Sequence, residues 1–153
     1  YKLVAKSKGN IPTRVTHQLI FGPLNSKSKL YASIAINLAN KEIYIPKNKK
    51  GLCWGQILID RQYRSFLGIS FNDYTSSDEI VEIAFYGLKG KLKTIKRKIT
   101  CGSSIILNNK FFNELNVNNE FIWYIAQSKR PDLSAKSFHY NIESHNGSGE
   151  HSF

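Results

Sequence analysis

Short runs of alternating apolar and polar residues recur along most of this chain. In an extended segment successive side chains point to opposite faces, so such alternation is typical of half-buried β-strands. Many residues in these runs are β-branched or aromatic, which favours strands over helices. The pattern predicts strands at residues 29–39, 41–47, 55–60, 65–71, 79–88 and 120–126.

Residues that favour tight turns separate the predicted strands. Examples are Asn72-Asp73 and the stretch from Gly87 to Gly90. Glycine and asparagine adopt backbone conformations that other residues resist, and they therefore mark chain reversals. Short strands joined by frequent turns are typical of sandwiches and barrels rather than of parallel α/β sheets. We therefore expect a mostly β fold with one or two short helices.

Residues 108–117 are the clearest helical candidate, because their apolar side chains recur on one side of a helix. Either Asn108 or Asn109 has a side chain that can cap the start of this helix. An apolar run precedes it and the predicted strand 120–126 follows it, so we expect a strand–helix–strand unit. A second stretch, residues 14–23, fits a helix, a strand or a loop equally well.

The length of 153 residues fits a single domain. Residues 137–153 are polar and contain Gly147 and Gly149, so we expect a frayed tail after one domain over residues 1–136. Because the chain begins at Tyr1 and contains no methionine, we expect it to be a fragment of a longer protein.

The positive charge is unevenly distributed. The net charge is +11, and residues 1–50 contain ten basic residues and one acid, whereas residues 101–153 contain four basic residues and five acids. This asymmetry predicts a polyanionic partner, with nucleic acid as the first expectation and an acidic membrane surface as the second. The alternative is a solvated, lysine-rich surface without a dedicated partner.

Residues 89–98, with the sequence KGKLKTIKRK, contain five lysines and one arginine without any acid. We predict a strand–loop–strand arm, narrow enough to enter a DNA major groove about 12 Å wide. Arg97 is the expected guanine contact because its planar fork matches two acceptors, and the lysines are expected to bind phosphates. The alternative is an exposed edge hairpin whose lysines prevent aggregation. The predicted contacts of this arm are Lys89, Lys91, Lys93, Lys96, Arg97 and Lys98.

A second polar cluster lies at residues 60–66, where glutamine and arginine side chains can read adenine and guanine. With two lysines upstream it is expected to form the other jaw of a clamp, and the alternative is a polar turn between two strands. A third group with similar chemistry surrounds His17. The predicted contacts in these groups are Arg61, Gln62, Tyr63, Arg64, Lys27, Lys29, Arg14 and Gln18.

The sequence offers little support for catalysis. His139, His145 and His151 lie in the predicted frayed tail, which cannot hold side chains to the roughly 0.5 Å that a catalytic site requires. We recognise no glycine-rich phosphate loop and no Ser-His-Asp arrangement. We therefore expect no catalytic residue, no metal, no cofactor and no small-molecule substrate in this domain.

Cys53 and Cys101 lie 48 positions apart and lack neighbours at zinc-ligand spacing. They are expected to be reduced, buried residues of a cytoplasmic protein. Trp54 and Trp123 are expected to lie in the core or a pocket wall rather than to stack on bases. No apolar run approaches the roughly 20 residues of a membrane-spanning helix, so no membrane-spanning segment is expected. Because nucleic acid is the first expectation for the polyanionic partner, no membrane partner is expected.

Three stretches are informative together: LNVNNEFIWYI at residues 115–125, KEIYIPK at 41–47 and IAFYGLKGKLKTIKRKITCG at 83–102. They resemble, in turn, the closing element, an early strand ending in Ile-Pro, and the basic arm of the DNA-binding pseudobarrel family. That family contains plant B3 transcription-factor domains and effector domains of certain restriction endonucleases. The order of basic arm, short helix and last strand is closer to the restriction-enzyme members.

This resemblance implies a B3-like, seven-stranded open pseudobarrel that grips one DNA duplex between two arms. The implied function is sequence-specific binding of double-stranded DNA, without catalysis, as the target-recognition domain of a restriction-modification protein in bacterial defence. The implied partners are double-stranded DNA and a nuclease or NTPase domain or subunit.

Two other functions stay open at this point. One is a small basic nuclease or ribonuclease toxin that uses His17 or the histidines near the C-terminus together with lysine. The other is a transcription regulator of the same barrel type, which would form a dimer and bind a palindrome. A variant of the first hypothesis is that the domain reads a flipped, modified cytosine in a pocket walled by Trp or Tyr.

Overall fold

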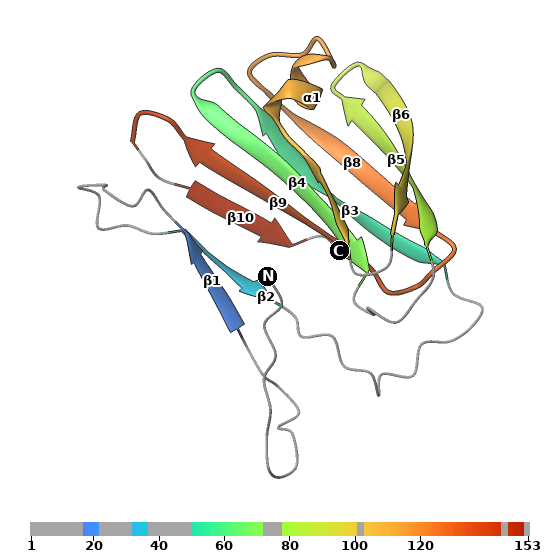
Figure 1. Ribbon diagram of the computed structural model, residues 1–153. Coiled ribbons are helices and arrows are strands. Elements are labelled where there is room, and N and C mark those ends of the chain that lie inside the picture. Colours follow the sequence, from blue (N-terminus) through green and yellow to red (C-terminus); the bar gives the residue numbers. More distant parts are fainter. Residues whose placement is uncertain are drawn as a thin grey trace, which may run out of the picture.

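The computed structural model describes residues 17–21, 32–36, 50–71, 78–100, 103–144 and 147–151. Within these residues strands predominate and one short helix is present, α1 (Asn109–Asn113). This confirms the expectation of a mostly β fold with few helices (Figure 1). The strands are β1 (His17–Phe21), β2 (Ala32–Ile36), β3 (Gly51–Ile59), β4 (Tyr63–Phe71), β5 (Glu79–Gly87), β6 (Gly90–Ile99), β7 (Ser104–Leu107), β8 (Glu120–Ser128), β9 (Leu133–Asn141) and β10 (Gly147–His151).

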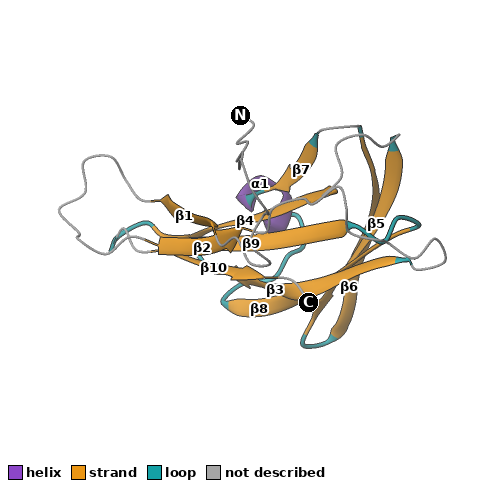
Figure 2. Cartoon of the chain, turned by 90° about the horizontal axis from the view of Figure 1, so that it is seen from below, coloured by secondary structure: helices purple, strands orange, loops and turns teal. Residues whose placement is uncertain are grey.

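Two four-stranded antiparallel sheets form most of the described structure. The strand order is β10-β9-β4-β7 in one sheet and β3-β8-β5-β6 in the other, and β1 and β2 form a separate antiparallel pair. Figure 2 shows from below that strands account for most of the described backbone. The antiparallel pairing agrees with the short strands and frequent turns of the sequence.

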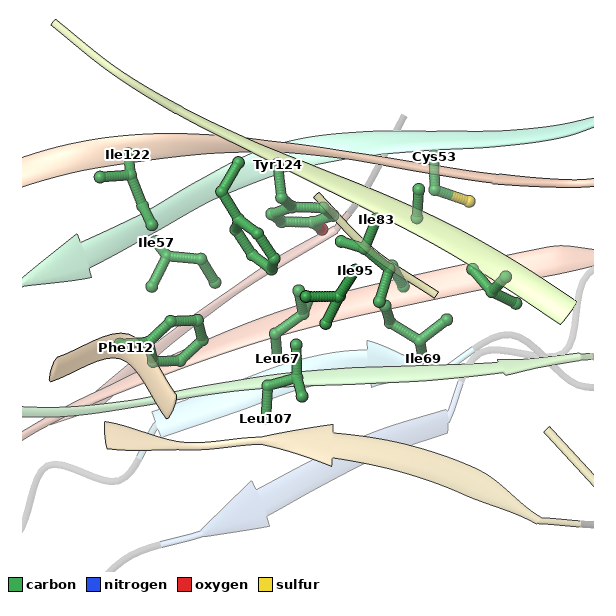
Figure 3. Close-up of a cluster of buried hydrophobic side chains, with 14 of the residues drawn as sticks. Cys53, Ile57, Leu67, Ile69, Ile83, Ile95, Leu107, Phe112, Ile122 and Tyr124 are labelled. Carbon is green, nitrogen blue, oxygen red and sulfur yellow. The ribbon is translucent and has the colours of Figure 1, made fainter. Parts of the chain in front are cut away.

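The hydrophobic core lies between the two larger sheets. Along β3 and β8 every second residue is buried, which is the alternation that a half-buried strand requires. Figure 3 shows Ile57 and Ile122 of one sheet opposite Leu67 of the other, with Phe112 of α1 at one end. Full burial of a branched aliphatic side chain stabilises the fold by roughly 1.5–3 kcal/mol, so these contacts hold the sheets together.

The predicted strand–helix–strand unit is confirmed as β7, α1 and β8. Asn108 caps α1, because its side chain accepts a hydrogen bond from the backbone N–H of Lys110 at 3.1 Å. Phe112 is buried, and its ring packs against Phe111 and Phe85 with centroid separations of 5.6 and 6.3 Å. The helix is therefore fixed to the end of the core although it is only five residues long.

Asn109 fastens the start of α1 to β4. The register that pairs Leu67 with Leu107 would place Asn109 opposite Ser65, at the point where β7 has ended. Its side-chain amide accepts from the Ser65 N–H at 2.6 Å and donates to the Tyr63 carbonyl at 3.1 Å. The amide thus satisfies two backbone groups of β4 that lie beyond the end of its ladder with β7.

The prediction of a frayed tail over residues 137–153 is wrong. β9 spans the predicted boundary, pairs with β4 over nine residues and pairs on its other side with β10. Ser137 and His139 are buried on β9 with 1% and 3% of their surface exposed. Their polar side chains face inward where the sequence pattern would require apolar residues, and this concealed the strand.

Only some of the predictions near the start of the chain fall on residues that the structure describes. β2 lies within the predicted strand 29–39, and β1 makes a strand of part of the ambiguous stretch 14–23. The predicted strand 41–47 and Cys101 lie outside the described residues. Cys53 is buried, as expected, and its Sγ donates to the carbonyl of Leu133 at 3.1 Å.

Candidate nucleic-acid interface

The predicted basic arm is an integral strand of the second sheet. β6 pairs with β5 in antiparallel register along nearly its whole length, with an irregularity between Phe85 and Tyr86. Ile95 and Ile99 of β6 are buried in the core and anchor the strand. The prediction of a separate strand–loop–strand arm is therefore wrong, and the alternative of a hairpin at the sheet edge describes the segment.

The turn between β5 and β6 places two lysines at an exposed tip. Gly90 has a φ of 115°, a conformation that residues with a side chain rarely adopt, so glycine is required there. Lys89 and Lys91 flank it and are exposed, and Leu88 has 87% of its surface exposed. The tip therefore presents two positive charges to solvent.

The lysines further along β6 form ion pairs with acids of the same molecule. Lys96 Nζ lies 3.4 Å from Glu82 Oε2, and Lys98 Nζ lies 2.6 Å from Asp78 Oδ2. Such exposed pairs typically contribute only about 0–1 kcal/mol each. Their lysines can therefore exchange a carboxylate for a phosphate at little cost.

Lys93 and Arg97 also have partners within the molecule. Lys93 Nζ lies 3.1 Å from Glu114 Oε2 and 5.2 Å from the centre of the Phe111 ring, which connects β6 to the end of α1. Arg97 is exposed, and its Nη1 donates to the backbone carbonyl of Lys96 at 3.1 Å. Its role as a guanine contact stays a prediction.

The second predicted cluster occupies the turn between β3 and β4. Asp60 closes this turn, because its side chain accepts from the N–H of Gln62 at 2.7 Å and its carbonyl accepts from the N–H of Tyr63 at 3.3 Å. Arg61 and Gln62 are exposed in the turn and Arg64 is exposed on β4, whereas Tyr63 is half-buried. A polar turn between two strands is the alternative expected from the sequence, and this turn leaves Arg61 and Arg64 accessible to solvent.

A polar pocket of about 170 Å³ lies between the β3–β4 turn and α1. Two guanidinium groups and three side-chain amides line it, which gives it donors and acceptors for phosphates or base edges. From the sequence, Asn108 or Asn109 is expected only as a helix cap, although the density of asparagines between residues 108 and 119 is a visible signal of a polar site. The polar lining residues are Asp60, Arg61, Arg64, Ser65, Asn109, Asn113 and Asn118.

The structure brings the two basic turns to the same end of the molecule. In Figure 1 the β3–β4 turn, α1 and the β5–β6 turn follow one another along one end of the sheets. The pocket lies between α1 and the β3–β4 turn, and the Lys93–Glu114 ion pair connects the end of α1 to β6. We call this surface the basic end, and its exposed cations are Arg61, Arg64, Lys89, Lys91 and Lys110.

The remaining predicted DNA contacts are not part of the basic end. Lys27, Lys29 and Arg14 lie outside the described residues, and Gln18 lies in β1. The expectation that Trp54 and Trp123 lie in the core or a pocket wall is wrong. Their exposed fractions are 41% and 44%, and they lie on the outer face of the β3-β8-β5-β6 sheet.

Two basic side chains of β9 are affected by burial. Burial lowers the pKa of His139 to about 4 and lowers the pKa of Lys136 from its ordinary value. His139 Nδ1 lies 3.1 Å from Ser65 Oγ, the residue directly across the ladder. At 3% exposure this imidazole has no access to a substrate in solution, so it does not serve as a surface acid or base.

The described ranges contain no group of three or more His, Cys, Asp and Glu side chains that would suit a metal ion. None of the helices in this part of the chain is long and apolar enough to cross a membrane. Comparisons with protein-family models, curated proteins and solved structures found no match to this chain. No relative therefore assigns a role to the residues of the basic end.

Proposed function

We propose that this protein binds double-stranded DNA through the basic end. The observation that carries the proposal is the position of two cationic turns on either side of α1, at one end of the sheets (Figure 1). Each turn is held by backbone pairing, so its cations are presented by a rigid scaffold. Two fixed positive points are suited to two phosphate tracks that border one groove.

The phosphate contacts come from the outer side chains of the basic end. Lys89 and Lys91 belong to one turn, and Arg61 and Arg64 belong to the other. Neutralising phosphates releases condensed counterions, so affinity falls with salt in proportion to the number of contacts. Binding weakens on the order of 10³-fold between about 50 and 200 mM salt if six or more cations of the whole chain participate.

The base contacts come from the polar pocket beside α1. Asn113 and Asn118 offer the amide geometry that pairs with adenine. These side chains lie between the two cationic turns, where a groove floor would approach if both turns bound phosphates. Sequence preference therefore arises at α1 and affinity arises at the turns.

The wider role follows from the family resemblance of the sequence motifs. It is that of a B3-like, seven-stranded open pseudobarrel that recognises the target sequence for a restriction-modification protein. The nuclease or NTPase activity then resides in another domain or subunit. Support from the fold is limited to its β-rich, antiparallel character and to the strand–helix–strand unit formed by β7, α1 and β8.

Charge-neutralising variants test the proposal. Arg61→Gln with Arg64→Gln, and Lys89→Gln with Lys91→Gln, are each expected to weaken duplex binding at least about tenfold at low salt. Each pair should reduce the slope of log K against log salt by about two, because two phosphate contacts are lost. Fluorescence anisotropy with a labelled duplex of random sequence measures both quantities.

Lys50→Gln with Lys129→Gln is the matched control. Both lysines are exposed and flank the Gly51–Ser128 pair, at the opposite end of β3 from the β3–β4 turn. This variant removes the same charge and is expected to change affinity less than about twofold. An equal loss in the control and the two test variants would show that the chain binds as a diffuse polycation and would overturn the proposal.

A further inference from the structure

The outer face of the β3-β8-β5-β6 sheet exposes a group of large apolar side chains. Five residues of this face keep between 41% and 57% of their surface exposed, and we call them the aromatic face. Contiguous exposed apolar patches on soluble proteins commonly mark binding sites. The residues of the aromatic face are Leu52, Trp54, Ile80, Phe121 and Trp123.

The strand register brings the two tryptophans together. Trp54 is opposite Ile125 and Trp123 is opposite Gln56, so the indoles are diagonal neighbours on adjacent strands. Their ring centroids lie 5.8 Å apart with an interplanar angle of 37°. On the other side of β8, Trp123 is opposite Tyr86 of β5, which extends the aromatic surface across a third strand.

A row of lysines borders the aromatic face along β6. Across the β5–β6 ladder, Tyr86 is opposite Lys91, Glu82 is opposite Lys96 and Ile80 is opposite Lys98. Two acids lie beside this row: Glu82 pairs with Lys96 at 3.4 Å, and Asp78 pairs with Lys98 at 2.6 Å. Aromatic rings on β3 and β8 therefore share one face of the sheet with lysines on the edge strand β6.

We propose that the aromatic face binds unpaired nucleotides of single-stranded DNA or RNA. Proteins that bind single strands combine cations for the backbone with aromatic rings on which bases stack. Here Trp54 and Trp123 provide the rings, and Lys96 and Lys98 provide the cations. A duplex cannot use this arrangement, because its base faces are already stacked on one another.

The charge of the face selects this ligand over an apolar protein partner. A docking partner that buried the aromatic rings would also desolvate the Lys96–Glu82 and Lys98–Asp78 ion pairs beside them, and an apolar surface offers these charges no hydrogen-bond partner. A single strand offers flat π-faces and phosphates in the same ligand, and the net charge of +11 attracts it. Lys91 also belongs to the basic end, but the two tryptophans and the cations Lys96 and Lys98, on which the inference depends, do not.

Tryptophan fluorescence is a selective probe of this site. The chain contains two tryptophans, and both lie on the aromatic face. Titration with unlabelled oligothymidine or oligouridine of about 12 nucleotides is expected to quench their emission in a saturable manner. Trp54→Ala and Trp123→Ala should each weaken binding of a labelled oligonucleotide on the order of tenfold.

Phe66→Ala provides the matched control, because Phe66 is an exposed aromatic residue, at 37%, on β4 of the other sheet. It should leave oligonucleotide affinity unchanged. Lys96→Gln with Lys98→Gln should lower the salt slope by about 1.4, as expected for two contacts to a single strand. Circular dichroism and duplex affinity verify that each variant is folded and that the basic end is unaffected.

Three results would overturn the inference. The first is the absence of saturable quenching by either oligonucleotide. The second is equal loss of binding in the Phe66 control and the tryptophan variants. The third is quenching that depends on protein concentration alone, with a doubled mass in light scattering, which would assign the face to a second copy of the chain. None of these results depends on whether duplex DNA binds the basic end.

Discussion

His139 shows how a single polar residue is accommodated inside this fold. The Ser65 hydroxyl donates to the carbonyl of Leu58, so its oxygen accepts from the Nδ1–H of His139. Nε2 of His139 has no hydrogen-bond partner among the described residues. Protonation of this nitrogen would bury a charge and an unpaired donor, which explains why burial lowers the pKa of His139.

The stability of the protein should therefore fall in mild acid. The pKa of His139 is about 4 in the folded state and about 6.5 in an unfolded chain. The unfolded chain binds the proton more tightly, so this contribution is fully present above about pH 6.5 and is lost as the pH falls towards 4. The free energy of unfolding should decrease by up to about 3 kcal/mol across this window.

His139→Gln separates this effect from the titration of carboxylates. Glutamine retains an N–H that can donate to Ser65 and has no titratable group. Urea denaturation at about pH 7 and about pH 4.5 should show a smaller loss of stability in the variant than in the native protein. An identical loss in both proteins would mean that the proton binds elsewhere.

Among the elements, α1 depends most on one side chain. Because Asn109 satisfies the Ser65 N–H and the Tyr63 carbonyl, Asn109→Ala leaves two backbone groups of β4 without these partners. Each lost partner of a poorly solvated group costs about 1–3 kcal/mol, so the free energy of unfolding should fall by about 2–6 kcal/mol. Denaturant titration measures this loss.

Asn113→Ala is the comparison on the same helix. Asn113 is exposed and lines the pocket, so its removal should change stability by less than about 0.5 kcal/mol and should reduce discrimination between DNA sequences. If Asn109→Ala were as stable as Asn113→Ala, the stabilising role assigned to the hydrogen bonds of the Asn109 amide with β4 would be wrong.

Some elements could be predicted from the sequence because local and tertiary signals agree. In α1 the cap at Asn108 and the buried Phe112 are consistent with one another. β6 was less predictable, because Arg97 occupies a position between the buried Ile95 and Ile99 and interrupts the alternation. A strand with three apolar residues among ten has the composition of a charged loop.

The exposed tryptophans could not be predicted for a different reason. β8 is apolar on both faces, with Phe121 and Trp123 on one and Ile122 and Tyr124 on the other. Alternation identifies the two faces but does not indicate which of them is covered by the second sheet. The polar pocket beside α1 could not be predicted either, because its lining residues Asp60 and Asn118 come together only when β3, β4 and α1 have assembled.

At the scale of the whole molecule, the cations are arranged in two settings that suit two forms of nucleic acid. The basic end presents cations on two rigid turns around a polar pocket, which suits a duplex. The aromatic face presents rings beside a lysine-bearing edge strand, which suits unpaired bases. Strand separation beside a bound duplex would allow both surfaces to act on one DNA molecule.

Lysine acetylation in the presence and absence of a DNA duplex, read by mass spectrometry, tests the central claim most directly. Lys89, Lys91 and Lys110 should be protected by bound duplex, because phosphates cover the basic end. Lys50 and Lys129, at the opposite end of β3 and β8, should react at the same rate with and without DNA. Protection of Lys50 and Lys129 with continued reactivity of Lys89 and Lys91 would contradict the account.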